Sequence, residues 1–295
     1  MQVSKSVYAL RARIKPYAEA YSPNVYLVTH GDRAIMIDSG FAGPSAQARL
    51  EYLRTIGSPR VEAILLTHHH IDHCSGAPGL AEVTGARIGM HPEEKRLLDL
   101  SLAQPRPPRS DDEGALQQET ARLRVDFEVN DGDVFSLGPL TLRAILTPGH
   151  SAGHLAFFLE EEGVLFGGDN VLGFGTTAIA PPPFGDMAAY LQSLETMLAL
   201  DAAVICTGHG PLVRRPARKI REIIAHRHER DRQVLALLGE GKRSLSELVV
   251  AVYPELDPRL EHMAHGQILS HLYKLQSEGK LTLRIHGDDI DCVLS

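Results

Sequence analysis

The sequence has few of the residues that mark several common classes of protein. It contains no tryptophan and only three cysteines, Cys74, Cys206 and Cys292. An odd number of cysteines without paired spacing excludes a disulfide framework and a cysteine-based zinc knuckle, and it fits a reducing compartment. Nowhere do about 18 apolar residues follow one another, and the first residues include no apolar segment typical of a signal peptide. We therefore expect a cytoplasmic protein that does not enter a membrane.

An excess of positive charge is also missing. The chain carries 30 Lys and Arg against 37 Asp and Glu, for a formal net charge of −7. This balance argues against a broadly basic nucleic-acid-binding protein. A chain of 295 residues, 43% of them hydrophobic, can bury one large core and a small second one. We therefore expect two domains, which we place at 1–213 and 214–295.

What is present in the first part of the chain is an alternation of apolar strands and helices. Two apolar stretches, 25–29 and 34–37, flank a Gly/Asp turn and predict a hairpin. A strand over 61–66 and a helix over 186–200 continue the alternation, which predicts an α/β layered domain. The polar, proline-rich stretch 104–114 is predicted to be a mobile loop.

From about Arg214 the pattern changes to continuous helix. The sequence Ser244 to Glu247 predicts a capping box at the start of one helix, and Asp257 with Pro258 predicts the start of another. Two short apolar runs, 281–285 and 290–294, then predict a β-hairpin. Helices followed by a hairpin in this order predict a small winged-helix domain.

Four potential metal ligands follow the apolar strand that ends at Leu66. They are His68, His70, Asp72 and His73, in the order His-x-His-x-Asp-His. Two histidines two positions apart at the end of a strand point to the same side, and the next turn carries Asp72 and His73 toward a second point. One metal ion cannot use all four side chains comfortably, whereas two ions can.

Three further candidate ligands each follow an apolar strand in a glycine-rich turn. They are His150 in Thr-Pro-Gly-His, Asp169 in Gly-Gly-Asp-Asn and His209 in Thr-Gly-His-Gly. Small residues beside each ligand let the backbone approach a site closely. One such residue alone is usually a solvated loop residue, but the recurrence of the pattern favours a shared site.

Together these motifs resemble those of the metallo-β-lactamase superfamily over residues 25–211. The resemblance implies an αββα sandwich and a role for every candidate ligand. It implies that His68, His70 and His150 bind a first metal, that Asp72, His73 and His209 bind a second, and that Asp169 bridges the two. It further implies that Asp38 braces the histidine loop from outside the ligand set, and that His69 and Cys74 are not ligands.

Imidazole and carboxylate ligands without a thiolate favour Zn²⁺, two ions per chain, and are compatible with Fe or Mn. A water shared by two cations becomes a hydroxide nucleophile near neutral pH. We expect Asp72 to orient this hydroxide and Asp169 to hold the two ions together, which makes these two the expected catalytic residues. The leaving-group acid, the metal and the bond that is cleaved stay open.

Two features narrow the class of hydrolase. Asp169 stands where the commonest class of zinc β-lactamases carries a cysteine, so antibiotic hydrolysis is not expected as the main activity. Only 40 positions separate Asp169 from His209, which leaves no room for the large inserted domain of the nucleases of this fold. A compact hydrolase with one pocket is therefore expected.

Residues after 213 resemble the branch of the superfamily that joins the hydrolase to a winged helix, the lactamase-beta-2-like branch. The matching segments are His226 to Arg230, Glu247 to Val249, His271 to Leu275 and Glu278 to Lys280. The branch implies either thioester hydrolysis on carrier-bound acyl chains or cleavage of single-stranded RNA. We expect hydrolysis of an ester or thioester of a small or carrier-bound acyl substrate, and we keep an endoribonuclease as the alternative.

A third hypothesis is a ligand-sensing regulator whose winged helix binds DNA. From Arg214 onward there are 14 Lys and Arg against 12 Asp and Glu, so the domain carries only about +2. We therefore expect the domain to pack on the hydrolase, to shape its pocket or to support a homodimer. Phe174, Phe184 and Tyr190 could form apolar walls for a substrate, and the alternative is that they belong to the core.

Overall fold

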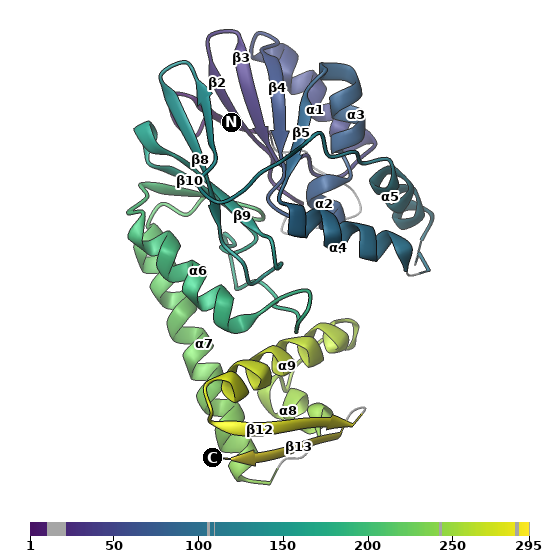
Figure 1. Cartoon of the computed structure of the whole chain (residues 1–295), viewed down its shortest axis with the longest axis vertical. Coiled ribbons are helices and arrows are strands. Elements are labelled where there is room, and N and C mark those ends of the chain that lie inside the picture. The colour runs from purple at the N-terminus through teal and green to yellow at the C-terminus, as the bar shows by residue number, and fades with distance from the viewer. Residues whose placement is uncertain (11–21, 105–106, 109, 242–243, 287–288, 295) are drawn as a thin grey trace.

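The computed structural model of the chain contains two facing β-sheets followed by a smaller, mainly helical unit (Figure 1). It describes residues 1–10, 22–104, 107–108, 110–241, 244–286 and 289–294. Helices α1 and α3 cover the outer face of the first sheet, and α6 and α7 run along the second (Figure 1). The fold is the predicted αββα sandwich with a C-terminal winged helix.

The first sheet has the strand order β1-β2-β3-β4-β5-β6. Strands β2 and β3 form the predicted antiparallel hairpin, and β3 to β6 run parallel to one another. Its strands are β1 Val7–Ala9, β2 Tyr26–His30, β3 Arg33–Ile37, β4 Arg60–Leu65, β5 Arg87–Met90 and β6 Phe127–Glu128. Side chains alternate along β3, because Ile35 and Ile37 pack toward the second sheet while Ala34 and Met36 pack toward the helices. The sheet therefore has an apolar core on each face.

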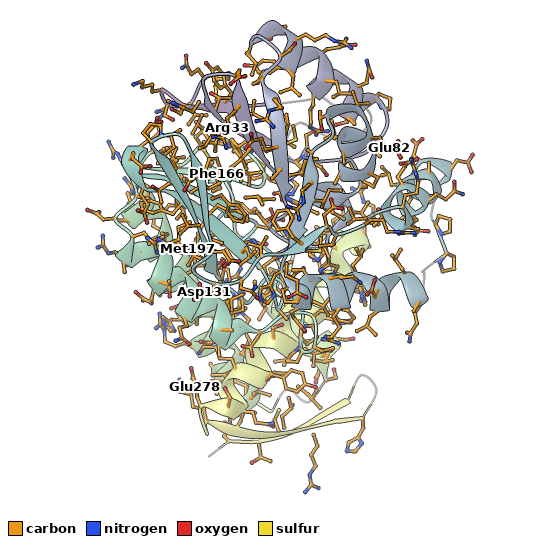
Figure 2. All side chains as sticks on the ribbon, turned by 45° about the horizontal axis from the view of Figure 1, so that its top comes forward. Arg33, Glu82, Asp131, Phe166, Met197 and Glu278 are labelled. Atoms are coloured by element: carbon orange, nitrogen blue, oxygen red, sulfur yellow. The ribbon has the colours of Figure 1, made fainter. Side chains whose placement is uncertain are left out.

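The second sheet has the order β11-β10-β9-β8-β7, with only β10 and β11 parallel. Its strands are β7 Val134–Leu137, β8 Leu140–Leu146, β9 Leu155–Leu159, β10 Val164–Gly168 and β11 Val204–Thr207. Phe166 of β10 lies between the two sheets (Figure 2). The centre of its ring is 5.5 Å from the centre of the Tyr26 ring. Helix α6, Met187–Ala199, packs on the other face and begins at the predicted position with Asp186 as its N-cap.

Several helices accompany the first sheet, and one of them begins inside the stretch 104–114, which was predicted to be a loop. They are α1 Pro44–Thr55, α2 Ile71–Cys74, α3 Ala77–Thr84, α4 Pro92–Ala103 and α5 Asp111–Ala121. The stretch 104–114 is not wholly a loop, since α5 begins at Asp111, where the Ser110 hydroxyl accepts a hydrogen bond from the Glu113 N–H. Residues 105, 106 and 109 lie outside the described residues.

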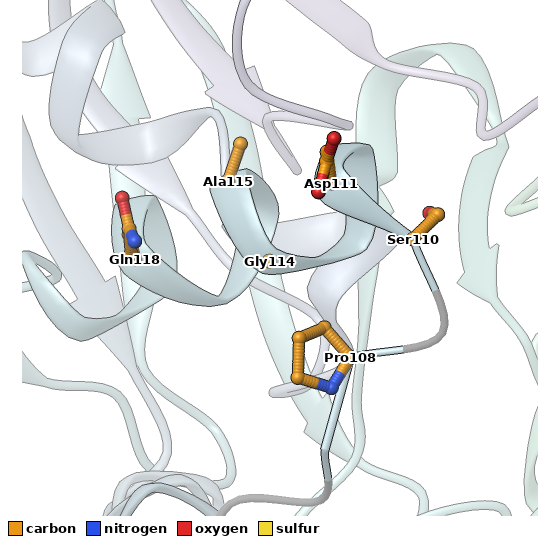
Figure 3. Close-up of a pocket in the computed structure, with 6 residues that line it drawn as sticks. All are labelled: Pro108, Ser110, Asp111, Gly114, Ala115 and Gln118. Atoms are coloured by element: carbon orange, nitrogen blue, oxygen red, sulfur yellow. The ribbon is translucent and has the colours of Figure 1, made fainter.

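A surface pocket lies beside the first turns of α5 (Figure 3). It is lined by Pro108, Ser110, Asp111, Gly114, Ala115 and Gln118. None of these side chains is buried, and none belongs to the predicted metal site. We assign this pocket no part in the chemistry.

The C-terminal unit consists of helices and one hairpin, as predicted. Its elements are α7 Pro216–Gly239, α8 Leu245–Val252, the short 3-10 helix Pro258–Leu260, α9 Glu261–Ser277, β12 Leu281–His286 and β13 Asp289–Leu294. The capping box of Ser244 and Glu247 is present at the start of α8. Helix α9 contacts both α6 and α7. Within the described residues, no helix is long and apolar enough to cross a bilayer.

Helix α7 belongs to both parts of the molecule by its contacts. Its first turns place Ile220 and Ile223 in the core formed with α6, whereas Val234 and Leu238 lie in the core of the C-terminal unit. The boundary between 213 and 214 therefore stays a prediction.

Candidate metal centre

All seven predicted ligands come together at one end of the sandwich, each in a segment that follows a strand, with Asp72 and His73 in the short helix α2. His68, His70, Asp72 and His73 follow β4, whereas His150 follows β8, Asp169 follows β10 and His209 follows β11. Every one of them occurs in at least one of three groups whose donor atoms lie within 4.8 Å of one another. The structure therefore joins motifs that are up to 141 positions apart in the sequence.

The first group consists of His68, His70 and His150. His70 Nδ1 lies 3.0 Å from His68 Nε2 and 3.0 Å from His150 Nε2. Nitrogens bound to one tetrahedral Zn²⁺ at roughly 2.0–2.1 Å lie about 3.3 Å apart, so this spacing fits one cation. Burial lowers the pKa of all three rings, to about 3 for His70. Neutral imidazoles keep a free lone pair, which is the state that metal binding requires.

The second group consists of Asp72, His73 and His209. His209 Nε2 lies 3.1 Å from Asp72 Oδ2 and 3.3 Å from His73 Nε2, and the distance from His73 Nε2 to Asp72 Oδ2 is 3.7 Å. Burial opposes ionisation of Asp72, but His73 and His209 together hold the pKa of its carboxyl at about 2. An ionised carboxylate and two imidazoles form a second ligand set that suits zinc.

Asp169 lies between the two groups. Its Oδ1 is 3.3 Å from His73 Nε2, and its Oδ2 is 3.5 Å from His209 Nε2 and 3.7 Å from His150 Nε2. Asp169 Oδ1 is buried and accepts no hydrogen bond within the described residues. A buried carboxylate oxygen without a donor is costly unless a cation satisfies it. This oxygen belongs to a carboxylate whose other oxygen, Oδ2, lies near both groups, and the pair of oxygens fits a metal-bridging carboxylate.

The histidines and aspartates of the centre shift one another's pKa values in opposite directions. Burial would lower the pKa of His73, but Asp169, Asp72 and Asp38 raise it well above its usual value. Burial would likewise raise the pKa of Asp169, but His73 and His209 hold it well below its usual range. The carboxylates are thus ionised at neutral pH, and a cation that binds at Nε2 of His73 would take the place of the proton there.

Asp38 supports the histidine loop as predicted. Its Oδ1 accepts hydrogen bonds from the Thr67 N–H at 2.8 Å and from the Thr67 hydroxyl at 3.0 Å, and its Oδ2 accepts from His73 Nδ1 at 2.8 Å. Donation from Nδ1 leaves His73 Nε2 free to face the centre. Asp38 has a φ of 59°, in the left-handed region, where an aspartate is more tolerated than most residues.

Glu94 is a functional residue that the sequence interpretation missed. Its fully buried carboxylate accepts hydrogen bonds from the N–H and Nδ1 of His69, the hydroxyl of Ser151 and the N–H of Gly153. His69 therefore faces Glu94 rather than a metal group, in agreement with its exclusion as a ligand. The carboxylate ties the loop after β4 to the loop after β8. The only signal in the sequence was an acidic residue in the first turn of a helix.

His154 supports the centre from outside the ligand groups. It is fully buried, its Nε2 accepts a hydrogen bond from the Asp169 N–H at 3.2 Å, and its Nδ1 lies 2.9 Å from the Thr147 hydroxyl. Burial lowers the pKa of its ring to about 3, so the ring stays neutral. His154 thereby holds the backbone of the residue that lies between the two ligand groups.

The three aromatic residues considered as substrate walls divide into two kinds. Tyr190 is fully buried and belongs to the core around α6, whereas Phe174 and Phe184 are 39% and 44% exposed. The Phe174 ring lies so close to Gly210 that a side chain there would collide with it. Because Gly210 follows His209, Phe174 lies beside the second ligand group.

The sequence matches the family model of the metallo-beta-lactamase superfamily over residues 18–209, and a model of the beta-lactamase associated winged helix domain over residues 244–282. The chain belongs to the metallo-beta-lactamase superfamily and is a hydrolase of that superfamily. Its His and Asp side chains form the metal-binding groups described above.

Similar proteins agree with this assignment. The lactamase-like protein nscB of Trichophyton rubrum is 32% identical over 291 residues, which cover 94% of this chain and 81% of that protein. An atrochrysone carboxyl ACP thioesterase of Aspergillus fumigatus is 29% identical, over 79% of this chain and 69% of its own length. The crystal structure of a metallo-beta-lactamase family protein from Thermus thermophilus has a TM-score of 0.76 and 28% identity, covering 97% of this chain and 98% of that one.

Proposed function

We propose that the chain is a dinuclear, zinc-dependent hydrolase of acyl thioesters or esters, acting on a small or carrier-bound acyl substrate. The observation that carries the proposal is the pair of ligand groups that share Asp169. In this proposal His68, His70 and His150 would hold one ion, Asp72, His73 and His209 would hold the other, and Asp169 would supply a ligand to both.

The chain's own residues have defined tasks in such a reaction. Two bound zinc ions supply Lewis acidity and lower the pKa of coordinated water toward neutrality. Asp169 lies beside His73 and His209 of one ligand group and His150 of the other, and Asp38 accepts the hydrogen bond of His73 Nδ1. The Asp72 side chain is 28% exposed, more than any other predicted ligand of its group, so it can accept a hydrogen bond from the attacking water.

Nucleophilic catalysis by a thiol does not fit the structure. Cys74, Cys206 and Cys292 are all buried, and burial raises the pKa of Cys74 and Cys206 above that of an ordinary thiol. A protonated, inaccessible thiol cannot attack an ester. Hydrolysis by water at the metal centre needs no such group.

The relative that is named an acyl carrier protein thioesterase supports a carrier-bound thioester as the substrate. The exposed ring of Phe174 beside His209 offers an apolar surface for an acyl chain. We infer that the thioester carbonyl meets the metal centre while the acyl chain lies toward Phe174.

The test compares three substrates with zinc-loaded protein: an acyl thioester of a carrier protein, the same acyl group on a small thiol, and labelled single-stranded RNA. Turnover of either thioester is expected, and Asp169→Asn should lower its kcat/KM by about 10³-fold. Asp99→Asn is the matched control, because Asp99 is an exposed residue of α4 whose carboxylate pairs with Lys95. Intact thioesters would contradict the proposal, and RNA cleavage in the same samples would favour the endoribonuclease instead.

A further inference from the structure

The segment 177–179, between β10 and α6, contacts one of the proposed ligands. It belongs to no helix or strand. His150 Nδ1 lies 3.0 Å from the Ala178 carbonyl oxygen and 3.1 Å from the Thr177 hydroxyl. Because a carbonyl oxygen can only accept, His150 donates from Nδ1, and its Nε2 keeps the lone pair that faces His70. The position of this segment therefore sets both the tautomer and the orientation of the His150 ring.

Side chains from α7 and α9 hold the peptide groups of this segment. Arg227 Nη2 donates a hydrogen bond to the Thr177 carbonyl. Gln267 Oε1 accepts from the Ile179 N–H at 3.0 Å, and the Ser270 hydroxyl donates to the Ile179 carbonyl at 2.7 Å. Buried peptide groups outside secondary structure need partners of this kind. Here the partners come from the C-terminal helices.

The burial of these three side chains is unusual for their chemistry. Arg227, Gln267 and Ser270 are exposed by only 2%, 7% and 1%. Arginine and glutamine are mostly exposed in proteins, and burying them costs free energy unless their polar atoms are bonded. The bonds to 177–179 offset part of this cost through Arg227 Nη2, Gln267 Oε1 and the Ser270 hydroxyl. Within the described residues, Arg227 Nε and Gln267 Nε2 have no hydrogen-bond partner.

Arg227 also contacts a tyrosine that bonds to the residue after Asp169. Its guanidinium carbon lies 5.4 Å from the centre of the Tyr190 ring, and the Tyr190 hydroxyl donates to the Asn170 carbonyl at 2.9 Å. Asn170 follows Asp169 in the sequence. One side chain of α7 is thus connected to the loops of two proposed ligands, His150 and Asp169.

We propose that Arg227, Gln267 and Ser270 are positioning residues of the metal centre. They hold the segment 177–179, and through it they fix the His150 ring toward the first metal. The C-terminal unit is then a structural part of that metal site. This inference rests on the role of His150 as a ligand in the proposed function.

The experiment is a zinc titration of the full-length, metal-free protein in competition with a chromogenic chelator. Wild type is expected to bind two ions. Gln267→Ala is expected to weaken the binding of one ion by about 10- to 100-fold, the range for residues that orient a ligand, and to change the other by less than about twofold. The ion that weakens is the one held by His68, His70 and His150, since that group contains the ring bonded to 177–179.

A matched control lies on the same helix. Gln276 is exposed, and its Oε1 accepts a hydrogen bond from the Leu283 N–H at 2.8 Å inside the C-terminal unit. Gln276→Ala therefore removes the same atoms and the same kind of bond without touching 177–179. It is expected to bind both ions with wild-type affinity.

A conservative pair separates positioning from packing. Arg227→Met keeps most of the apolar stem and removes the donor to Thr177, whereas Arg227→Lys keeps a cationic donor. Arg227→Met is expected to weaken the binding of the first ion as Gln267→Ala does. Arg227→Lys is expected to restore at least part of the affinity for that ion. Equal affinities for the two variants would contradict a positioning role.

The outcomes also separate this inference from the proposed function. If wild type binds no zinc, the proposed function is wrong. If wild type binds two ions and both Gln267→Ala and Ser270→Ala bind them with wild-type affinities, only the present inference is overturned. Equal weakening of both ions with a lowered unfolding midpoint would indicate general destabilisation and would overturn it as well. Ser270→Ala decides the question if Gln267→Ala does not fold.

Discussion

Two buried clusters in this molecule combine aspartate with histidine, and they differ in how their oxygens are satisfied. Around Asp169, imidazole nitrogens lie 3.3 to 3.7 Å away, and Oδ1 accepts no hydrogen bond within the described residues. In the C-terminal unit, Asp231 accepts from His271 Nδ1 and from Lys274 Nζ, each at 2.7 Å. The first carboxylate is open to a cation, and the second is already neutralised by one.

The difference shows what distinguishes a metal site from a structural ion pair. Burial opposes ionisation at both aspartates, and at both of them cationic neighbours hold the pKa below its usual value. Residue types, burial and pKa direction are therefore shared. What is particular to the centre around Asp169 is that imidazole nitrogens and carboxylate oxygens of several residues face one another, and among the described residues no lysine pairs with these carboxylates. Such an arrangement is unfavourable unless a cation is bound.

The largest expected effect comes from removing the shared ligand. Asp169→Asn leaves both ligand groups without their common carboxylate, and metal catalysis is worth several kcal/mol of transition-state stabilisation. We expect kcat/KM on an acyl thioester to fall by about 10³-fold and bound zinc to fall below two ions per chain. Steady-state kinetics and metal analysis of the same sample measure both quantities. Full activity with two bound ions would show that Asp169 is not a bridging ligand.

The second-largest expected effect is on the free energy of unfolding. It comes from Glu94, whose carboxylate connects two ligand loops. Glu94→Ala leaves donors of His69, Ser151 and Gly153 buried without an acceptor, so we expect the free energy of unfolding to fall by about 3 kcal/mol. Urea denaturation measures this change. Glu93→Ala, at the neighbouring and more exposed residue that pairs with Arg96, should change it by less than about 1 kcal/mol. Similar losses of unfolding free energy for the two variants would contradict the role of Glu94 in connecting the two loops.

The same carboxylate predicts a dependence on pH. Burial alone would raise the pKa of Glu94, but its bonds with His69 and Ser151 have the larger effect and lower the pKa from the ordinary value of 4.5 to about 2. A depressed pKa means that this contribution to stability is fully present above about pH 4.5 and is lost as the pH falls toward 2. The stability difference between wild type and Glu94→Gln should therefore shrink over this interval. A difference that stays constant between pH 6 and pH 3 would count against an ionised Glu94.

The smallest expected effect is at Asp231, the aspartate of the ion-pair cluster in the C-terminal unit. Asp231→Asn removes the charge that neutralises Lys274 and weakens the bond with His271, so we expect a loss of about 2 kcal/mol in the free energy of unfolding. The folded variant should still bind two zinc ions, because the bonds of Asp231 lie inside the C-terminal unit. Thermal unfolding and zinc titration together check this. Loss of zinc from the folded variant would mean that the two clusters are coupled.

Prediction from the sequence succeeded where the signal is local. The His-x-His-x-Asp-His motif lies within six residues, and each of the other proposed ligands lies in a short glycine-containing turn after an apolar strand. The hairpin of β2 and β3 and the capping box of α8 are equally local, and the structure confirms both. The prediction for the stretch 104–114 was wrong in part, because its prolines indicated a loop although a helix begins at Asp111.

The sequence by itself determined the family, the layered fold and the set of side chains that converge, since each follows from spacing along a few residues or from the alternation of strands and helices. Only the tertiary structure decided which residues support that set. Glu94 bonds to His69 across 25 positions, and Gln267 bonds to Ile179 across 88. Contacts of this kind depend on how helices pack against loops, and no local pattern encodes them, because any buried polar group can serve as a partner if packing brings it within hydrogen-bonding distance.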